Sequence, residues 1–460
     1  MSSGLIARSL SKVRALVANA TGVGGESEEK LLDRARQQLQ ECAEGLGGEV
    51  STRVRAARLA QTYLGLGDAG RHAFLRMIAL EFGPDPERIA RAHADYQTAV
   101  GSDAQWEAEA RLRAAMRSAR IRILTQFNAI PEGVKFLVDL RADLLRYLRN
   151  DEELQALDRE LEARLSAWFD VGFLELARVT WNSPAALLEK IVEYEAVHEI
   201  SSWKDLKNRL DSDRRCYAFF HPRMPMEPLI FVEVALLEEL ADNVQRLLDE
   251  NAPLVDTARA TTAIFYSISN TQAGLRGVSF GNFLLKRVVD DLQRDFPKLK
   301  TFATLSPMPG LLRWATQHRE TVLAAFQPAD WKRLAEAGIA GPQAMELDQI
   351  IAGGSGWQDD PLLARALREP LLRIAAGYLT GARKDDGQPV DPVARFHLGN
   401  GARIERLNWL ADTADKGLRQ SWGIMVNYLY DPDRIEDNVE AFARDGRIDV
   451  TPAIKRLAGR

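Results

Sequence analysis

The sequence predicts an α+β multidomain protein, in which an N-terminal helical bundle is followed by an α/β domain. Between residues 26 and 170, apolar residues recur at spacings of three and four, which is the pattern of a buried helix face. After about residue 200, short runs of β-branched and aromatic residues alternate with helical segments. We therefore expect a flexible N-terminal arm over residues 1–25, the bundle over residues 26–185 and the α/β domain over residues 186–460.

The first 25 residues carry Arg8, Lys12 and Arg14, with no acidic residue before Glu26. This composition is found in transit peptides, and it is also found in weakly amphipathic arms at the ends of folded domains. We interpret the segment as a flexible arm.

Clear start and stop signals divide the first half into separate helices. In the first helical segment, the apolar face and the glycine pair that ends it are Leu31, Ala35, Leu39, Cys42, Leu46 and Gly47–Gly48. A later helix starts at Asp151–Glu153, where the helix dipole favours acidic residues. Several helices joined by short turns predict a bundle, and we interpret its apolar stripes as packing surfaces.

The second half contains the strand candidates. They are short and rich in β-branched and aromatic residues: Cys216–His221, Leu229–Ala235, Thr261–Ser269, Thr301–Leu305, Arg403–Leu410 and Gly423–Tyr430. An amphipathic helix is expected over about residues 282–296, and the helical pattern returns over residues 311–380. This alternation predicts a mixed α/β domain.

The composition argues against several classes of protein. Sixty Lys and Arg against 65 Asp and Glu give a net charge of −5, without the basic excess of a nucleic-acid coat. No stretch reaches the roughly 18 apolar residues of a membrane span. Two widely separated cysteines, Cys42 and Cys216, argue against a disulfide framework or a zinc site and predict a cytoplasmic protein. We expect no nucleic acid and no membrane as a partner.

A glycine-rich turn from Gly274 to Gly281 joins the third strand candidate to the amphipathic helix. The backbone N–H groups of such a turn, with the following helix N-terminus, favour a phosphate, and Arg276 offers further donors. The spacing matches neither the dinucleotide fingerprint nor the P-loop. A phosphate-binding turn and an ordinary strand-to-helix turn both remain open from these residues alone.

Two further side chains occupy site-like positions. Ser306 ends a strand candidate and precedes Pro307–Pro309, whose proline rings fix the backbone; no GxSxG elbow surrounds it. His397 lies between an apolar pair and a glycine-flanked turn. No HExxH motif occurs, so no catalytic metal is expected. Asp391, together with Asp385–Gly387, is interpreted as part of a solvated turn.

Five segments carry a resemblance to a known family. They are WKDLKNRLDSDRRCYAFFHP (203–222), TTAIFYSISNTQAGLRGVSFGNFLLKRVVDDLQRDFP (261–297), FATLSPMPGLLRW (302–314), ARFHLGNGARIERLNWLAD (394–412) and GIMVNYLY (423–430). In these segments, which follow one order through the second half, the chain closely resembles malonyl-CoA decarboxylase. The first half is similar to that family's N-terminal bundle in length and texture.

The resemblance implies a helical oligomerisation domain and a catalytic domain of the N-acetyltransferase (acyl-CoA-binding) fold. The positions that match the family's coenzyme A-binding turn are Arg276, Gly277, Val278, Ser279, Phe280, Gly281 and Asn282. The family's catalytic serine matches Ser306 and its catalytic histidine matches His397. The C-terminal tyrosine of the family's NYxY motif matches Tyr430, and the asparagine of that motif matches Asn427. Both are included in the expected catalytic set.

The activity implied by the resemblance is conversion of malonyl-CoA to acetyl-CoA and CO₂ through a thioester enolate. The thioester carbonyl accepts the electron pair, so no cofactor is expected. Ser306 is expected to bind the substrate carboxylate or carbonyl, and His397, with a near-neutral pKa, to protonate the enolate. A homo-oligomer (dimer or tetramer) is also implied. Two alternatives stay open: an acyl-CoA N-acetyltransferase, and a non-catalytic acyl-CoA-binding scaffold.

Overall fold

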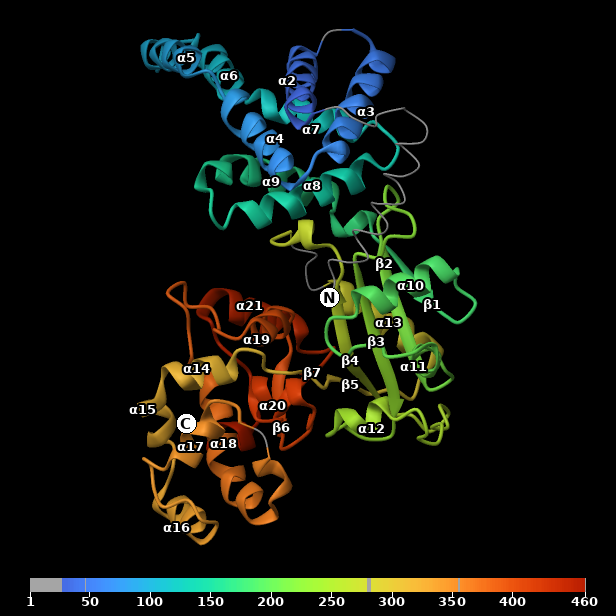
Figure 1. The fold of residues 1–460 in the computed structure, drawn as a ribbon, viewed down its shortest axis with the longest axis vertical. Coiled ribbons are helices and arrows are strands. Elements are labelled where there is room, and N and C mark those ends of the chain that lie inside the picture. Colours follow the sequence, from blue (N-terminus) through green and yellow to red (C-terminus); the bar gives the residue numbers. More distant parts are fainter. Residues whose placement is uncertain (1–26, 46, 279–282, 355, 460) are drawn as a thin grey trace. The chain divides into compact units, whose positions relative to one another are not determined.

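The computed structural model describes residues 27–45, 47–278, 283–354 and 356–459, and it divides the chain into two compact units (Figure 1). The helical unit contains the chain up to Glu175 and two later segments, Phe220–Leu229 and Asn270–Ser279. The α/β unit contains Leu176–Phe219, Ile230–Ser269 and Phe280–Arg460. The expected N-terminal arm, residues 1–25, lies outside the described residues.

The helical unit is built from eight described α-helices, which confirms the helical character of the first half. They are α2 (Glu28–Glu44), α3 (Glu49–Gly65), α4 (Asp68–Glu81), α5 (Pro86–Ala99), α6 (Gln105–Ala115), α7 (Ala119–Phe127), α8 (Gly133–Tyr147) and α9 (Gln155–Trp168). The stripe Ala35, Leu39 and Cys42 of α2 is buried, as its spacing predicts. A short 3₁₀ helix, η3 (Ala273–Leu275), also belongs to this unit.

A mixed seven-stranded sheet forms the centre of the α/β unit. Its strands are β1 (Glu175–Val179), β2 (Arg214–Phe220), β3 (Ile230–Leu237), β4 (Thr262–Asn270), β5 (Thr301–Thr304), β6 (Arg403–Asn408) and β7 (Met425–Tyr430). Their spatial order is β1-β2-β3-β4-β5-β7-β6. The pair β4–β5 is parallel, whereas β2–β3, β5–β7 and β6–β7 are antiparallel. All six strands predicted from the sequence are present.

The central strands are buried along nearly their whole length, because both faces of the sheet are covered. This explains why their sequences are continuous apolar runs rather than alternating patterns. One core cluster joins β3, β4, β5 and β7 to the helix α12 (Val244–Leu248). Its buried members are Ala235, Val244, Leu247, Ile264, Tyr266, Ala303, Leu305, Ala411 and Met425.

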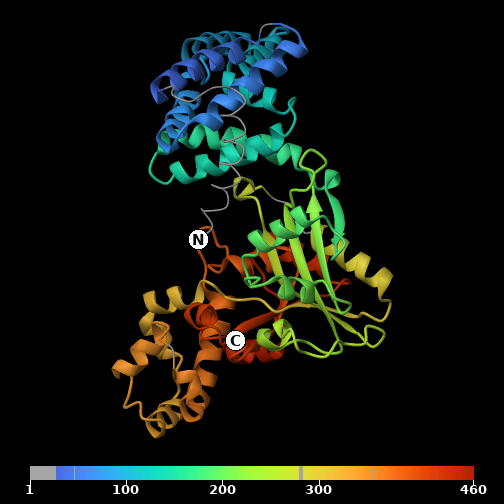
Figure 2. The same cartoon turned by 45° about the vertical axis from the view of Figure 1, so that its right-hand side comes forward.

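Helices complete the α/β unit. They are α10 (Ala185–Tyr194), α11 (Trp203–Arg209), α12, α13 (Phe283–Asp295), α14 (Leu311–Gln317), α15 (Arg319–Ala324), α16 (Pro328–Glu336), α17 (Met345–Ile351), α18 (Pro361–Gly381), α19 (Pro392–Gly399), α20 (Asp415–Ser421), α21 (Ile435–Asp445) and α22 (Pro452–Leu457). In Figures 1 and 2, the helices from α14 to α18 gather away from β2 and β3. The helices α18 and α22 contact the edge strand β6. None of the helices in the described ranges is long and apolar enough to span a membrane.

The edge strand β1 corrects one sequence expectation. Residues 175–179 fall within the stretch predicted to be helical bundle, but they form a strand next to β2. Only Val179 in this segment is β-branched and only Val179 is buried, so the segment lacks an alternating pattern. The strand conformation therefore follows from the free edge of β2 rather than from local preference.

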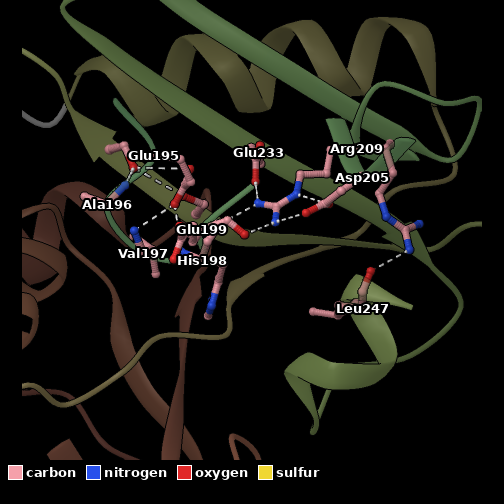
Figure 3. A network of polar contacts seen from close by, with 12 residues as sticks. Glu195, Ala196, Val197, His198, Glu199, Asp205, Arg209, Glu233 and Leu247 are labelled. Carbon is pink, nitrogen blue, oxygen red and sulfur yellow. Dashed lines mark hydrogen bonds and ion pairs between the residues drawn. The ribbon is translucent and has the colours of Figure 1, made fainter. Parts of the chain in front are cut away.

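A buried ionic network fixes the segment before α11 to the sheet (Figure 3). The Arg209 guanidinium binds Asp205 at 2.8 Å and Glu233 of β3 at 3.1 Å, and it donates to the carbonyls of His198 and Glu199. Arg209 and Glu233 are almost fully buried. We call Arg209, Asp205 and Glu233 the ionic network.

Candidate active site

Ser306 is fixed to β7 by its backbone. The β5–β7 register brings Ala303 opposite Leu429, and the same register continues to Ser306 opposite Val426. Ser306 and Val426 exchange two backbone hydrogen bonds of 2.9 Å each. The serine side chain is therefore held at a sheet position where its backbone cannot shift without breaking the ladder.

His397 is positioned by the N-cap of its helix. Asp391 caps α19, accepting hydrogen bonds from the backbone N–H groups of Val393 and Ala394. Its other carboxylate oxygen accepts from Gly310 N, four residues after Ser306, and from the Tyr378 hydroxyl. The interpretation of Asp391 as a solvated turn residue is wrong, since it is 2% exposed and links the start of α19 to the Ser306 segment.

Four side chains form one buried hydrogen-bonded chain. Ser306 Oγ lies 3.1 Å from His397 Nε2, and His397 Nδ1 lies 2.7 Å from Tyr430 Oη. On its other side, Ser306 Oγ donates to Thr304 Oγ1 at 2.8 Å. The imidazole stacks on the ring of Tyr428, with centroids 4.5 Å apart. We call Tyr430, His397, Ser306 and Thr304 the neutral chain.

The Tyr430 hydroxyl determines which group donates in each hydrogen bond of the neutral chain. The Tyr430 hydroxyl has no other acceptor in the described part of the protein, and a buried donor is nearly always satisfied. It therefore donates to Nδ1, which leaves the hydrogen of the imidazole on Nε2. Nε2–H then donates to Ser306 Oγ. In this arrangement His397 does not accept the serine hydrogen, which Ser306 Oγ instead donates to Thr304 Oγ1.

Burial sets the protonation states of the side chains in the neutral chain. Desolvation lowers the pKa of His397 to about 3, so the imidazole is neutral at pH 7. Burial raises the pKa of Tyr430 well above its usual value, so the phenol keeps its hydrogen. The expectation of a near-neutral pKa for His397 is thus wrong for the free protein, because the sequence could not reveal how completely this helical histidine is enclosed.

Asn427 has a full set of partners beside the neutral chain. Its amide nitrogen donates to the carbonyls of Thr304 and Ala241, and its amide oxygen accepts from Arg406 and Asn408. Thr304 Oγ1 in turn accepts from the backbone N–H of Tyr428. These side chains replace backbone ladder bonds between β5 and β7, which suggests that Asn427 shapes the strand pair that holds Ser306.

The three expected coenzyme A positions that the structure describes, Arg276, Gly277 and Val278, belong to the helical unit. Arg276 and Gly277 are exposed and Val278 is buried, whereas Ser279, Phe280, Gly281 and Asn282 lie outside the described residues. We call residues 273–278 the glycine turn. It is part of the helical unit, while Ser306, His397, Asn427 and Tyr430 gather in the α/β unit. Over the described ranges, no group of three or more His, Cys, Asp or Glu side chains forms a metal-binding cluster.

Thr304, Asp391 and Tyr428 were missed by sequence reasoning. Thr304 lies two residues before Ser306, so strand alternation places both on one face; this signal was available. Asp391 precedes a proline at the first turn of α19, which is the sequence pattern of a capped helix start. Tyr428 offered no local signal, because its contact with His397 depends on the packing of α19 against the sheet.

The fold and this cluster define an enzyme with a helical unit, an α/β unit and buried groups able to exchange protons. Family models match both parts of the chain: "Malonyl-CoA decarboxylase C-terminal domain" matches residues 172–459, and "Malonyl-CoA decarboxylase N-terminal domain" matches residues 82–169. The chain belongs to the malonyl-CoA decarboxylase family, which is a family of carboxy-lyases.

Known proteins support this assignment over most of the chain. Mitochondrial malonyl-CoA decarboxylase of Anser anser anser is 37% identical over 424 residues, which cover 88% of this chain and 84% of the relative. The solved structure of malonyl-CoA decarboxylase from Rhodopseudomonas palustris has a TM-score of 0.83 at 39% sequence identity. The match covers 94% of this chain and 100% of the Rhodopseudomonas palustris chain. That from Agrobacterium vitis has a TM-score of 0.83 at 41% identity, covering 93% and 100%.

Proposed function

We propose that this protein decarboxylates malonyl-CoA to acetyl-CoA and CO₂ without a cofactor, using the neutral chain as its acid. The observation that carries the mechanism is the buried contact between Ser306, His397 and Tyr430. Family membership supports the substrate. We also propose the N-acetyltransferase fold for the α/β unit, which is supported by the parallel neighbours β4 and β5 and by the glycine turn and α13 between them in sequence.

The electron pair of the breaking bond determines what the protein must do. The bond between the α-carbon and the carboxylate breaks, CO₂ leaves, and the electron pair enters the thioester as an enolate. The α-carbon then takes one proton. Ser306, which donates only to Thr304 in the free protein, turns its hydroxyl to the substrate carboxylate or thioester oxygen. Its burial excludes water that would protonate other positions.

His397 supplies the proton in this proposal. The substrate carboxylate brings a negative charge near a neutral imidazole, and an opposite charge raises a histidine pKa. His397 thus takes up a proton when the substrate binds and delivers it through Nε2–H to the α-carbon. Since Nε2 already carries a hydrogen, the added proton occupies Nδ1, and the Tyr430 hydroxyl then accepts from Nδ1–H and keeps hold of the ring. The balance is one proton consumed for each acetyl-CoA and CO₂ formed.

Malonyl-CoA supplied as the only substrate tests the proposal. We expect acetyl-CoA and CO₂ without an acceptor, and roughly two to four decades less turnover in Ser306→Ala and in His397→Ala. The matched control is His318→Ala: His318 is exposed, stacks on Trp314 and should not affect turnover. An N-acetyltransferase would need an added amine, and an acyl-CoA-binding scaffold would bind coenzyme A without turnover. Near-normal CO₂ release by His397→Ala would remove the proposed acid.

Two further proposals concern the whole protein. Self-association through the helical unit, as a dimer or tetramer, is supported by large apolar side chains that this unit leaves exposed, among them Val50, Val100, Trp106 and Met116. A cytoplasmic location also remains a prediction, based on the composition.

A further inference from the structure

The buried side chain of Arg141 connects α8 to the glycine turn. Its Nη1 donates to the carbonyl oxygens of Gly274 and Arg276, at 2.9 and 2.7 Å. Its charge is balanced by two carboxylates of α9: Nε binds Asp158 at 2.9 Å and Nη2 binds Glu162 at 2.8 Å. Only 1% of the Arg141 side chain is exposed. The guanidinium is thus occupied by protein groups and does not itself reach a ligand.

The glycine turn fits tightly against the two helices. A Cβ added at Gly274 would lie 1.8 Å from the carbonyl oxygen of Val138 on α8. Gly277 has a φ of +89°, and a Cβ there would lie 2.9 Å from a Glu162 carboxylate oxygen. The turn therefore depends on glycine at both positions, for close approach at the first and for backbone conformation at the second.

The two carbonyl contacts determine where one N–H group points. A trans peptide directs its C=O and N–H groups to opposite sides, and the chain has no cis peptide in the described residues. Because Arg141 holds the Arg276 carbonyl, the N–H of Gly277 points away from the guanidinium. The N–H groups of Leu275, Arg276 and Val278 donate to backbone carbonyls three residues earlier in the chain, whereas that of Gly277 has no acceptor among the described residues.

We propose that Arg141 is a positioning residue for coenzyme A binding: it fixes the glycine turn so that Gly277 N–H is presented to a phosphate of the coenzyme. This rests on the proposed function, in which the turn binds the coenzyme A pyrophosphate. It gives the helical unit a direct part in substrate affinity. If Arg141 only joined α8 to α9, its loss would lower stability and leave affinity unchanged.

Arg120 provides a matched control within the same unit. It is 5% exposed, pairs with Glu160 of α9 at 2.7 Å and donates to a backbone carbonyl, that of Ala79. Arg120 therefore repeats the chemistry of Arg141 with a carbonyl that lies outside the glycine turn. Arg→Lys at either position keeps the charge and loses the planar fork that serves several acceptors at once.

The experiment compares Arg141→Lys with Arg120→Lys in the full chain. We measure Kd for coenzyme A by calorimetry, KM and kcat with malonyl-CoA, and thermal unfolding. Both variants should be less stable than wild type. Only Arg141→Lys should raise Kd for coenzyme A and KM, each by about tenfold, with kcat changed less than about threefold. Wild-type affinity for coenzyme A in folded Arg141→Lys, or an equal loss in Arg120→Lys, would overturn the inference.

A second variant keeps the inference testable if Arg141→Lys does not fold. Asp158→Asn removes the carboxylate charge that orients Nε of Arg141 and changes no residue of the glycine turn. Because Arg141 would then fix the turn less firmly, Kd for coenzyme A should rise by a few-fold. An unchanged Kd in Asp158→Asn would then overturn the inference. Failure of the proposed function looks different, since wild type would bind coenzyme A but release no CO₂.

Discussion

The α/β unit buries two polar groupings that differ in charge. The neutral chain contains Ser306, His397 and Tyr430 and holds no formal charge in the free protein. The ionic network contains Arg209 between Asp205 and Glu233 (Figure 3). Both are almost completely removed from water. Burial alone therefore does not distinguish a reactive site from a structural one.

The difference shows which buried polar groups can respond to a ligand. In the ionic network the Arg209 guanidinium already lies between two acids, Asp205 and Glu233, although burial raises the pKa of Glu233 to about 8. Removing the guanidinium leaves these acids without their cation. The neutral chain has no internal counter-charge, so an incoming carboxylate changes the protonation preference of His397. A site for an anionic substrate benefits from the second arrangement, while the first is suited to holding the segment before α11 on the sheet.

The largest expected effect breaks the ionic network. Arg209→Met should lower the free energy of unfolding by about 3–5 kcal/mol, because the buried acids Asp205 and Glu233 would lose their cation. Chemical denaturation measures this. The control is Arg259→Met, which breaks a 2.9 Å pair with Glu238 on the surface and should cost less than about 1 kcal/mol.

The activity of Arg209→Met shows whether the ionic network also supports turnover. If the ionic network is structural, Arg209→Met should retain kcat within about threefold at a temperature where it is folded. A fall of 100-fold in kcat with full secondary structure would show that the two groupings are not separable.

The second prediction concerns Tyr430, whose hydroxyl contacts Nδ1 of the His397 ring. Tyr430→Phe removes the donor to Nδ1, so the imidazole hydrogen is no longer fixed on Nε2; we expect about tenfold lower kcat, which corresponds to the loss of one hydrogen bond. Tyr428→Phe is the control. It keeps the ring that stacks on His397 and removes a buried hydroxyl without a partner in the described structure. Equal losses in both variants would contradict the orienting role of Tyr430.

The sequence indicated the residues that we propose as catalytic, and it missed those that act through strand register or packing. Ser306 and His397 lie in motifs that a family resemblance can transfer, and strand patterns placed the segments around them. Thr304 acts only because β5 and β7 pair in one register. Arg141 lies 133 and 135 positions before the carbonyls it holds. No local pattern in a helix indicates a partner so distant, so its part in the glycine turn required the fold.

The smallest effect tests the neutral state of His397 directly. With a folded pKa of about 3 against about 6.5 when unfolded, His397 takes up a proton in the unfolded state alone as pH falls below 6.5. Stability should therefore fall with decreasing pH, by about 1 kcal/mol between pH 6.5 and 5.5 from this residue. His397→Gln cannot take up that proton, so its unfolding free energy should vary less over this range by the same amount. Identical slopes would mean that folded His397 titrates near 6.5, and the acid would then be an imidazolium present before substrate binds.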